Sequence, residues 1–194
     1  CSFSSTSDTE VILKAYGRWG ERCVDHFFGM FAFVIYEHRT GRLVLVRDRL
    51  GIKPLYLTRS ADALRFASTL PALLAGGGVD TEIDPVALHH FLSWHAVVPA
   101  PLTILKGVRK VAPATIVTVE PDGQSASHTY WRAEFDRQPR YAGWGEEEWA
   151  QAVLAGLRTA VERRMVADVP VGVLLSGGLD SSLIVGLLAE NGQS

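Results

Sequence analysis

The sequence predicts a mixed fold, in which an α+β domain precedes the start of an α/β domain. Three observations support this prediction. Short strand-like runs separated by turn residues fill much of residues 30–131, as in antiparallel sheets. Residues 133–145 are rich in Arg, Pro and Gly and have little periodicity. After them, a helical pattern, an apolar run and a Gly-Gly turn into a second helix follow one another as in parallel α/β sheets.

The composition excludes several classes of protein. Of 194 residues, 47% are hydrophobic and 21% are charged, with a formal net charge of -2, so the chain is neither disordered nor fibrous. A near-neutral chain without a basic stripe gives no reason to expect nucleic-acid binding. The longest apolar stretch, residues 27–36, is about half of what a membrane span needs. Two cysteines are too few for a disulfide framework, so we expect a reducing, cytoplasmic setting.

The first helix is predicted over residues 7–19. Ser7 and Glu10 have the spacing of a capping box. The apolar residues that recur at helical spacing are Val11, Ile12, Ala15, Tyr16 and Trp19. A second helix is expected after Asp84 and Pro85, which suit the N-cap and first helical positions. The side chains expected on one face of it are Leu88, Phe91, Leu92 and His95.

Several strands are predicted between and after these helices. The run at 43–46 is apolar at every position, so we expect it to be buried on both faces. Cys23 and the aromatic group Phe27, Phe28, Phe31 and Phe33 are expected in the core. The strands are predicted at residues 30–36, 43–46, 55–57, 64–67, 116–119 and 128–131, the last two paired around a turn at 121–123.

The second part of the chain begins with a predicted linker, residues 133–145. A helix is expected from Glu146, with an apolar stripe at Trp149, Val153, Leu157, Val161 and Met165. A buried strand is then expected over residues 169–175, followed by a loop and a further helix.

The loop after residue 175 has the chemistry of an anion-binding site. Gly177 and Gly178 let the backbone approach an anion, and the N–H groups of the following helix point toward it. The hydroxyls of Ser176, Ser181 and Ser182 add further donors. The carboxylate of Asp180 could hold a metal that bridges phosphates, or could cap the helix. The alternative is a tight strand-to-helix turn that requires glycine only for its shape.

These residues resemble a known family. The run Ser176-Gly177-Gly178-Leu179-Asp180-Ser181 matches the pyrophosphate loop of N-type ATP pyrophosphatases. The stretch DVPVGVLL before it is similar to that of glutamine-hydrolysing asparagine synthetases. SDTEVIL at 7–13, GMFAF at 29–33 and RDRLGIKPLY at 47–56 are similar to the glutaminase half of the same family, and in the same order.

The resemblance implies an enzyme with two sites that uses ATP and Mg²⁺. Residues 1–132 would be the C-terminal part of an N-terminal-nucleophile αββα glutaminase domain of the class II amidotransferases. Residues 146–194 would be the start of a parallel-sheet ATP pyrophosphatase domain. Ammonia released from glutamine would pass to the second site, where ATP adenylates a carboxylate substrate and ammonia displaces AMP.

The resemblance also implies roles for individual residues. Asp8 matches the residue that holds the α-amino group of glutamine, with helix capping as the alternative. Leu175 matches the residue whose backbone meets the adenosine of ATP, with strand core as the alternative. Asp180 would hold the metal, and Asp48 and Arg49 would support the loop beside the sheet. The residues implied to bind ATP and pyrophosphate are Leu175, Ser176, Gly177, Gly178, Asp180, Ser181 and Ser182.

The chain departs from the family pattern at the nucleophile. The family nucleophile is an N-terminal Cys about a hundred residues before the matching Asp, whereas Cys1 is only seven residues from Asp8. Phe3 and Ser5 align with the strand that enters the Ser-Asp motif. We therefore do not expect Cys1 to be the nucleophile and assign no catalytic residue. The six histidines show no metal-ligand spacing.

We expect this chain to be an internal piece of a longer enzyme, inactive alone and homodimeric in the complete form. Its carboxylate substrate would be aspartate or a glutaminyl dipeptide, because residues 95–110 are similar to the branch that amidates N-acetylglutaminylglutamine. Two alternatives remain open: a non-catalytic interaction or remnant module, and a ligase like β-lactam synthetase that lacks glutaminase activity.

Overall fold

The computed structural model describes residues 2–190. The chain divides into two compact units, Cys1–Ala133 and Glu134–Ser194. Each unit is described by itself. Within the described residues, no helix combines the length and apolar character needed to cross a bilayer.

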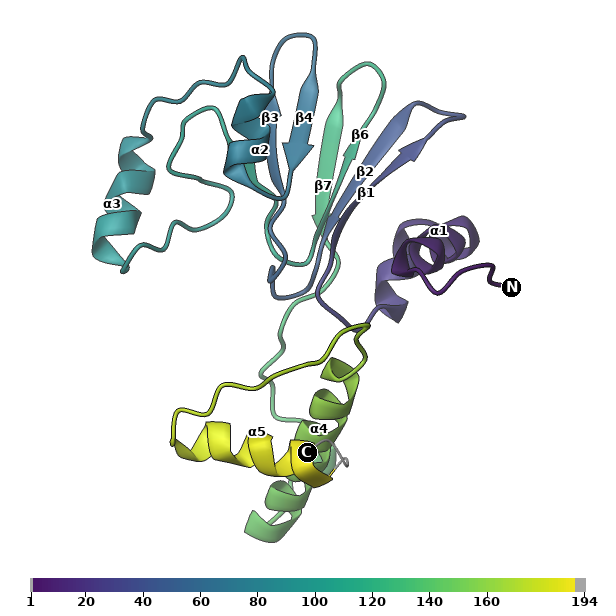
Figure 1. The fold of residues 1–194 in the computed structure, drawn as a ribbon, viewed down its shortest axis with the longest axis vertical. Helices are drawn as coiled ribbons and strands as arrows, with labels where there is room; N and C mark the ends of the chain where they lie inside the picture. Colours follow the sequence, from purple (N-terminus) through teal and green to yellow (C-terminus); the bar gives the residue numbers. More distant parts are fainter. Residues whose placement is uncertain (1, 191–194) are drawn as a thin grey trace. The chain divides into compact units, whose positions relative to one another are not determined.

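The first unit contains two antiparallel sheets (Figure 1). The first has the strand order β1-β2-β6-β7 and the second has the order β4-β3-β5. The predicted strands of this unit all form antiparallel pairs. The last of them, expected at residues 128–131, covers Ser125–Thr129 instead, with Ile116 paired to His128. The strands are β1 (Ala32–Glu37), β2 (Arg42–Arg47), β3 (Tyr56–Arg59), β4 (Leu64–Ala67), β5 (Arg109–Lys110), β6 (Thr115–Val119) and β7 (Ser125–Thr129).

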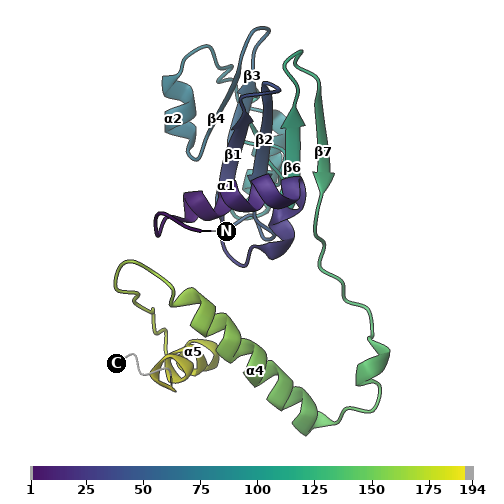
Figure 2. The same ribbon diagram turned by 90° about the vertical axis from the view of Figure 1, so that its right-hand side faces the viewer.

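Helices cover the two outer faces of the paired sheets, which gives an αββα order of layers (Figures 1 and 2). Helix α1 (Asp8–Trp19) and the 3₁₀ helix η1 (Gly20–His26) pack on the first sheet, and the short helix α2 (Leu70–Ala75) packs on β3 and β4. This is the layering that the family resemblance implies for a glutaminase domain. The sequence analysis missed α2 and β5, which have too few residues to show periodicity.

Strand β2 belongs to two hydrophobic cores. Val44 and Val46 pack with Ala15, Cys23 and Ile116 under α1 and η1. Leu45 points the other way and packs with residues of the second sheet, among them Leu55 and Val111. Val44, Leu45 and Val46 are essentially inaccessible to solvent, so burial on both faces is confirmed.

Two side chains at the end of β2 hold the loop that follows it. The buried carboxylate of Asp48 accepts hydrogen bonds from the backbone N–H groups of Leu50, Ile52 and Lys53, at 3.1, 3.0 and 2.9 Å. The Arg47 guanidinium donates to the carbonyls of Lys53 (2.9 Å), Gly51 (2.6 Å) and Val111 (2.5 Å). The supporting role expected for Asp48 is therefore the one observed. Val111 directly follows β5, so Arg47 also connects the two sheets.

Two expectations about apolar side chains need correction. Phe27, Phe31 and Phe33 pack against the core, but Phe28 is 62% exposed and lies beneath the guanidinium of Arg49, 5.5 Å from the ring centroid. Helix α3 (Pro85–Ser93) begins at Asp84 as predicted, but its buried residue is Ala87. The side chains expected on one face of α3 are exposed at Leu88, Phe91 and Leu92, and His95 lies beyond the end of the helix.

The second unit contains two helices in contact, α4 (Glu146–Arg164) and α5 (Leu179–Glu190). Arg158 on α4 donates to Glu190 on α5, with Nε to Oε2 at 2.8 Å. Residues 133–145 are less featureless than a linker: they contain a 3₁₀ turn, η2 (Pro139–Tyr141), and a ring cluster. In this cluster Tyr141 and Trp144 pack against Trp149 of α4, with ring centroids 4.4 to 5.2 Å apart.

The strand predicted over residues 169–175 does not form within the described residues. The segment has irregular backbone, and Leu174 is 94% exposed. A strand is held by hydrogen bonds to a neighbouring strand, and no described segment pairs with this one. The prediction of a strand over residues 169–175 is therefore wrong for this structure.

The Asp48 contacts predict a large effect on stability. Replacing Asp48 by Ala leaves three backbone N–H groups without their acceptor, and we expect the free energy of unfolding of the first unit to fall by about 3 kcal/mol. Urea unfolding of the chain measures this as a lower midpoint at unchanged slope.

The matched control for this prediction is Asp122→Ala. Asp122 also accepts a backbone N–H, that of Gln124 at 2.8 Å, but it is exposed in the β6–β7 turn. Its loss is expected to cost less than about 1 kcal/mol. Equal midpoints for the two variants would contradict the role assigned to Asp48.

Candidate functional site

The start of α1 keeps Asp8 available for binding. The N-cap is Ser7, whose Oγ accepts the N–H of Thr9 at 3.2 Å. Asp8 is the first residue of the helix and is exposed, and its carboxylate has no hydrogen-bond or ion-pair partner among residues 2–190. The capping alternative for Asp8 is therefore wrong.

Glu10 does not complete the capping box that its spacing predicts. Its carboxylate instead accepts the N–H groups of Ser4 (2.9 Å) and Ser5 (2.7 Å) and the Ser5 hydroxyl (2.6 Å), and it pairs with Lys14 at 2.6 Å. The Lys14 ammonium and the Ser5 hydroxyl hold the pKa of Glu10 well below its usual range. Glu10 thus anchors the segment before α1. Sequence reasoning missed this, because the contact joins residues five and six positions apart in irregular backbone.

The segment before α1 also differs from the prediction. Residues 2–7 contain no strand, although Phe3 and Ser5 were aligned with one. Cys1 lies outside the described residues. Cys23 is a core thiol, as expected, and its burial raises its pKa to about 11.

The loop at 176–182 has the backbone of an anion-binding turn. Gly177 has φ +82°, in the left-handed region that favours glycine. The Ser181 hydroxyl donates to the Gly178 carbonyl at 3.0 Å, so the Ser176 hydroxyl is the donor in its 2.9 Å contact with Ser181. The Ser182 N–H makes the first helical hydrogen bond, to Gly178 at 3.0 Å. The two hydroxyls are therefore held side by side at the entrance to α5.

The N–H groups of the first α5 residues are directed at this entrance. Leu179, Asp180 and Ser181 have no acceptor within the helix, because the first turn of a helix never provides one. A Cβ placed on Gly178 would lie 3.4 Å from the Ser176 hydroxyl oxygen and 3.9 Å from that of Ser181. Both distances are ordinary van der Waals contacts, so position 178 lies directly beside the hydroxyl pair.

Asp180 provides an exposed carboxylate beside these donors. It lies in the first turn of α5 and has no hydrogen-bond or ion-pair partner in the described part of the chain. No group of three or more His, Cys, Asp or Glu side chains among residues 2–190 is arranged to hold a metal ion. Mg²⁺ commonly takes one or two carboxylates together with substrate phosphates. Asp180 therefore fits Mg²⁺ as a ligand that is shared with a bound phosphate.

Leu175 precedes the loop and is 60% exposed. The alternative that its side chain is strand core is not observed, because the strand does not form within the described residues. Its backbone leads directly to Ser176, which keeps it beside the hydroxyl pair.

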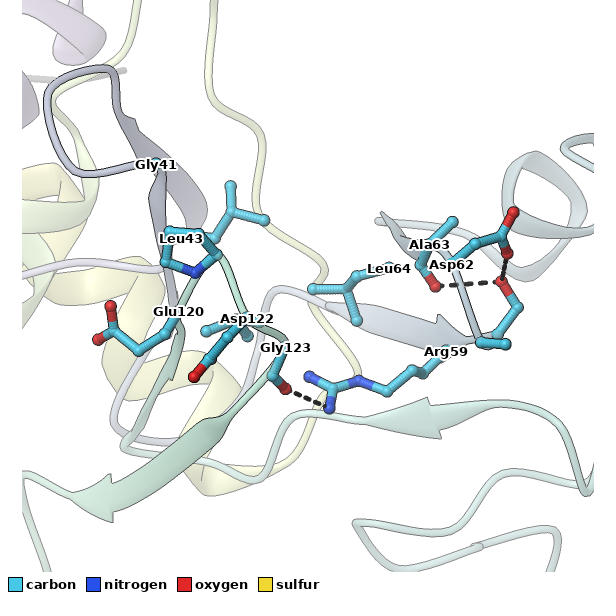
Figure 3. A pocket seen from close by; sticks show the side chains of 13 residues that line it. Gly41, Leu43, Arg59, Asp62, Ala63, Leu64, Glu120, Asp122 and Gly123 are labelled. Atoms are coloured by element: carbon cyan, nitrogen blue, oxygen red, sulfur yellow. Dashed lines mark hydrogen bonds between the residues drawn. The ribbon is translucent and has the colours of Figure 1, made fainter.

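A separate hollow of about 490 Å³ lies at the tips of three hairpins in the first unit (Figure 3). It is lined by residues of the turns that follow β1, β3 and β6. Arg59 on β3 reaches across and donates from Nη1 to the carbonyl of Gly123 at 2.8 Å, which ties the second sheet to the β6–β7 turn (Figure 3). No residue that sequence reasoning assigned to a site lines this hollow.

Family models match both parts of the chain. Residues 1–131 match the model described as glutamine amidotransferase domain, and residues 152–194 match the model described as asparagine synthase. The first match covers more than half of the chain and contains Asp8. The second contains the whole loop at 176–182.

The curated relatives agree with these models. Glutamine-hydrolysing asparagine synthetases 3 and 1 of Bacillus subtilis are 35% and 38% identical over 96% and 97% of this chain. The chain spans about 30% of the length of each. Among solved structures, a glutamine phosphoribosylpyrophosphate amidotransferase from B. subtilis matches 99% of this chain and 39% of its own, with 17% identity and a TM-score of 0.44.

Motifs, family models and relatives therefore agree from the first helix to the loop at 176–182. Over residues 1–131 the chain belongs to the glutamine amidotransferase domain family, and over nearly its whole length it is similar to glutamine-hydrolysing asparagine synthetases.

Proposed function

We propose that this chain carries parts of two sites of an ATP-dependent amidotransferase that hydrolyses glutamine and amidates a carboxylate. The observation that supports this most is the loop at 176–182. There, a left-handed Gly177, the paired hydroxyls of Ser176 and Ser181 and the free N–H groups at the start of α5 lie together. The same loop resembles pyrophosphate loops, which supports pyrophosphate as its ligand.

The proposed chemistry explains why such a loop is needed. A carboxylate is a poor acyl donor, because it lacks a good leaving group. Attack of its oxygen on the α-phosphorus of ATP breaks the bond to the bridging oxygen and releases pyrophosphate. Ammonia then adds to the acyl carbon, loses a proton and displaces AMP. Donors at the start of α5 would stabilise the negative charge that develops on pyrophosphate.

The residues proposed to bind ATP and pyrophosphate have three different roles. Ser176, Gly177, Gly178, Ser181 and Ser182 would donate hydrogen bonds to its oxygens. Asp180 would hold Mg²⁺, which screens the charge of the phosphates when bound. The exposed backbone of Leu175 would meet the adenosine.

Asp8 would bind the α-ammonium group of glutamine in the other site. Its exposed, unpartnered carboxylate supports this, because Ser7 caps the helix and Glu10 anchors the preceding segment. The nucleophile that attacks the glutamine amide is not assigned to any described residue.

The proposal includes domain limits and a substrate class. Residues 1–132 would form part of the glutaminase domain, 133–145 the connection, and 146–194 the start of the ATP-binding domain. Aspartate is the proposed carboxylate, because the relatives named above are asparagine synthetases. A glutaminyl dipeptide is the alternative, supported by the similarity of residues 95–110 to that branch. Synthesis assays with each acid distinguish the two.

Replacing Asp180 by Ala in the enzyme that carries these residues tests the ATP site. We expect ATP–pyrophosphate exchange driven by the acid substrate to fall at least about a hundredfold, because Mg²⁺ and charge stabilisation are lost. Glutamine hydrolysis should be largely unchanged, because Asp8 belongs to a separate unit. The control is Asp168→Ala, another exposed carboxylate of the second unit. Exchange at the wild-type rate in Asp180→Ala would leave the Gly-Gly turn with a structural role only.

Replacing Asp8 by Ala tests the glutamine site. Glutamine-dependent synthesis should fall at least about tenfold, because the ammonium group loses its ionic partner. Synthesis from added ammonium salt should continue at the wild-type rate. Circular dichroism should show α1 intact, since Ser7 provides the cap. The control is Asp25→Ala, an exposed carboxylate of the same unit.

The Asp8 experiment also separates the alternatives. If Asp8→Ala leaves both syntheses unchanged while the wild type shows no glutamine hydrolysis, the protein is a ligase without glutaminase activity. If the wild type shows neither ATP–pyrophosphate exchange nor glutamine hydrolysis, the interaction or remnant module is correct.

A further inference from the structure

Serine hydroxyls hold the backbone on both sides of Asp8. Before it, the Ser7 N–H donates to the Oγ of Ser5 at 3.3 Å. After it, the Thr9 N–H donates to the Oγ of Ser7 at 3.2 Å. Because the backbone is fixed at both neighbours, the direction in which the Asp8 side chain leaves the helix is fixed as well.

The Ser5 hydroxyl connects these bonds to Glu10. It donates to the Oε2 atom of Glu10 at 2.6 Å and accepts the N–H of Ser7. A hydroxyl has one hydrogen to donate and two lone pairs, so both bonds can form at the same time. Glu10, Ser5 and Ser7 therefore form a hydroxyl relay, which begins at the Glu10 carboxylate and ends at the residues beside Asp8.

The Glu10 carboxylate is a rigid starting point for this relay. Its Oε1 atom accepts the N–H and the hydroxyl of Ser4, at 2.9 and 3.0 Å, and lies 2.6 Å from the ammonium nitrogen of Lys14. Its Oε2 atom also accepts the N–H of Ser5 at 2.7 Å. Lys14 lies one turn further along α1, so the carboxylate is tied to the body of the helix.

We propose that Glu10 is a positioning residue, which acts through Ser5 and Ser7 to hold the Asp8 carboxylate where the α-ammonium group of glutamine binds. This inference rests on the function proposed above for Asp8. The Asp8 carboxylate has no partner of its own among residues 2–190, so its backbone is what limits where it can lie. A carboxylate that is held in place before glutamine arrives loses less freedom when the ammonium group binds.

Ser4 and Ser5 offer a matched pair of variants to test the relay. Each donates to Glu10 from its N–H and from its hydroxyl, but only the Ser5 hydroxyl also accepts the Ser7 N–H. In the enzyme that carries these residues, we expect Ser5→Ala to raise the KM for glutamine at least about threefold with kcat unchanged, because binding of the ammonium group is weakened. Ser4→Ala should stay within about twofold of the wild type.

Glu10→Ala removes the starting point of the relay and should raise the KM for glutamine at least about fivefold. Synthesis from added ammonium salt is measured beside each assay and gives the fraction of active enzyme, because it does not use the glutamine site. If Glu10→Ala does not fold, Ser5→Ala and Ser4→Ala decide the outcome.

A second experiment separates positioning from a general effect on stability. In an Asp8→Ala background, Ser5→Ala should cause no further rise in the KM for glutamine, because no carboxylate remains to be positioned. A loss of stability would act equally in both backgrounds. An equal effect of Ser5→Ala with and without Asp8 would therefore overturn the inference.

The same set of variants distinguishes failure of this inference from failure of the glutamine site. Equal KM values for Ser5→Ala and Ser4→Ala, with a large effect of Asp8→Ala, would overturn the positioning role alone. A wild-type KM for glutamine in Asp8→Ala would overturn the binding role of Asp8, and the positioning role of Glu10 with it.

Discussion

The first unit depends on the burial of β2 on both of its faces. β2 supplies Val44 and Val46 to the core under α1 and Leu45 to the core between the sheets. Because its side chains alternate between these two cores, a shift of one residue in register would exchange the two sets. The apolar run that the sequence shows at 43–46 therefore fixes both layers at once. Arg47 and Asp48 follow immediately and hold the next loop by hydrogen bonds to its backbone.

At the two candidate sites, structural contacts and the outward carboxylate belong to different residues. At α1, Ser7 caps the helix and Glu10 anchors the preceding segment, so neither task uses Asp8. At α5, Ser176 and Ser181 hold each other, so Asp180 has no structural contact of its own. Each site thus separates the side chains that shape the backbone from the carboxylate that faces outward. An outward carboxylate can change its partner without a cost to the fold.

Sequence reasoning predicted the elements whose periodic pattern extends over many residues or whose turns contain distinctive residues. α1, the three hairpins, the start of α3 and the Gly-Gly loop belong to this class. It missed α2 and β5, which are too short for a pattern to emerge. It expected a strand at 169–175, because an apolar run reports the tendency to pair but not the presence of a partner.

The errors at single residues have a common physical origin. Phe28 and the apolar side chains of α3 are exposed, although their types suggest a core. Hydrophobicity shows that burial would be favourable, but the geometry of the surrounding elements decides whether it occurs. The Glu10 contact is similar, because Ser4 and Ser5 reach the carboxylate through irregular backbone that has no periodic signal. The site residues themselves came from motifs, and their availability for binding became clear only from the contacts of their neighbours.

The loop after β2 has a consequence for how such a protein can evolve. Asp48 and Arg47 hold it only through backbone N–H and carbonyl groups, which every residue except proline provides in full. The side chains at Leu50 and Ile52 project outward and are 68% and 50% exposed. Their identity is therefore largely decoupled from the shape of the loop. Selection can change the surface that this loop presents while its backbone stays the same.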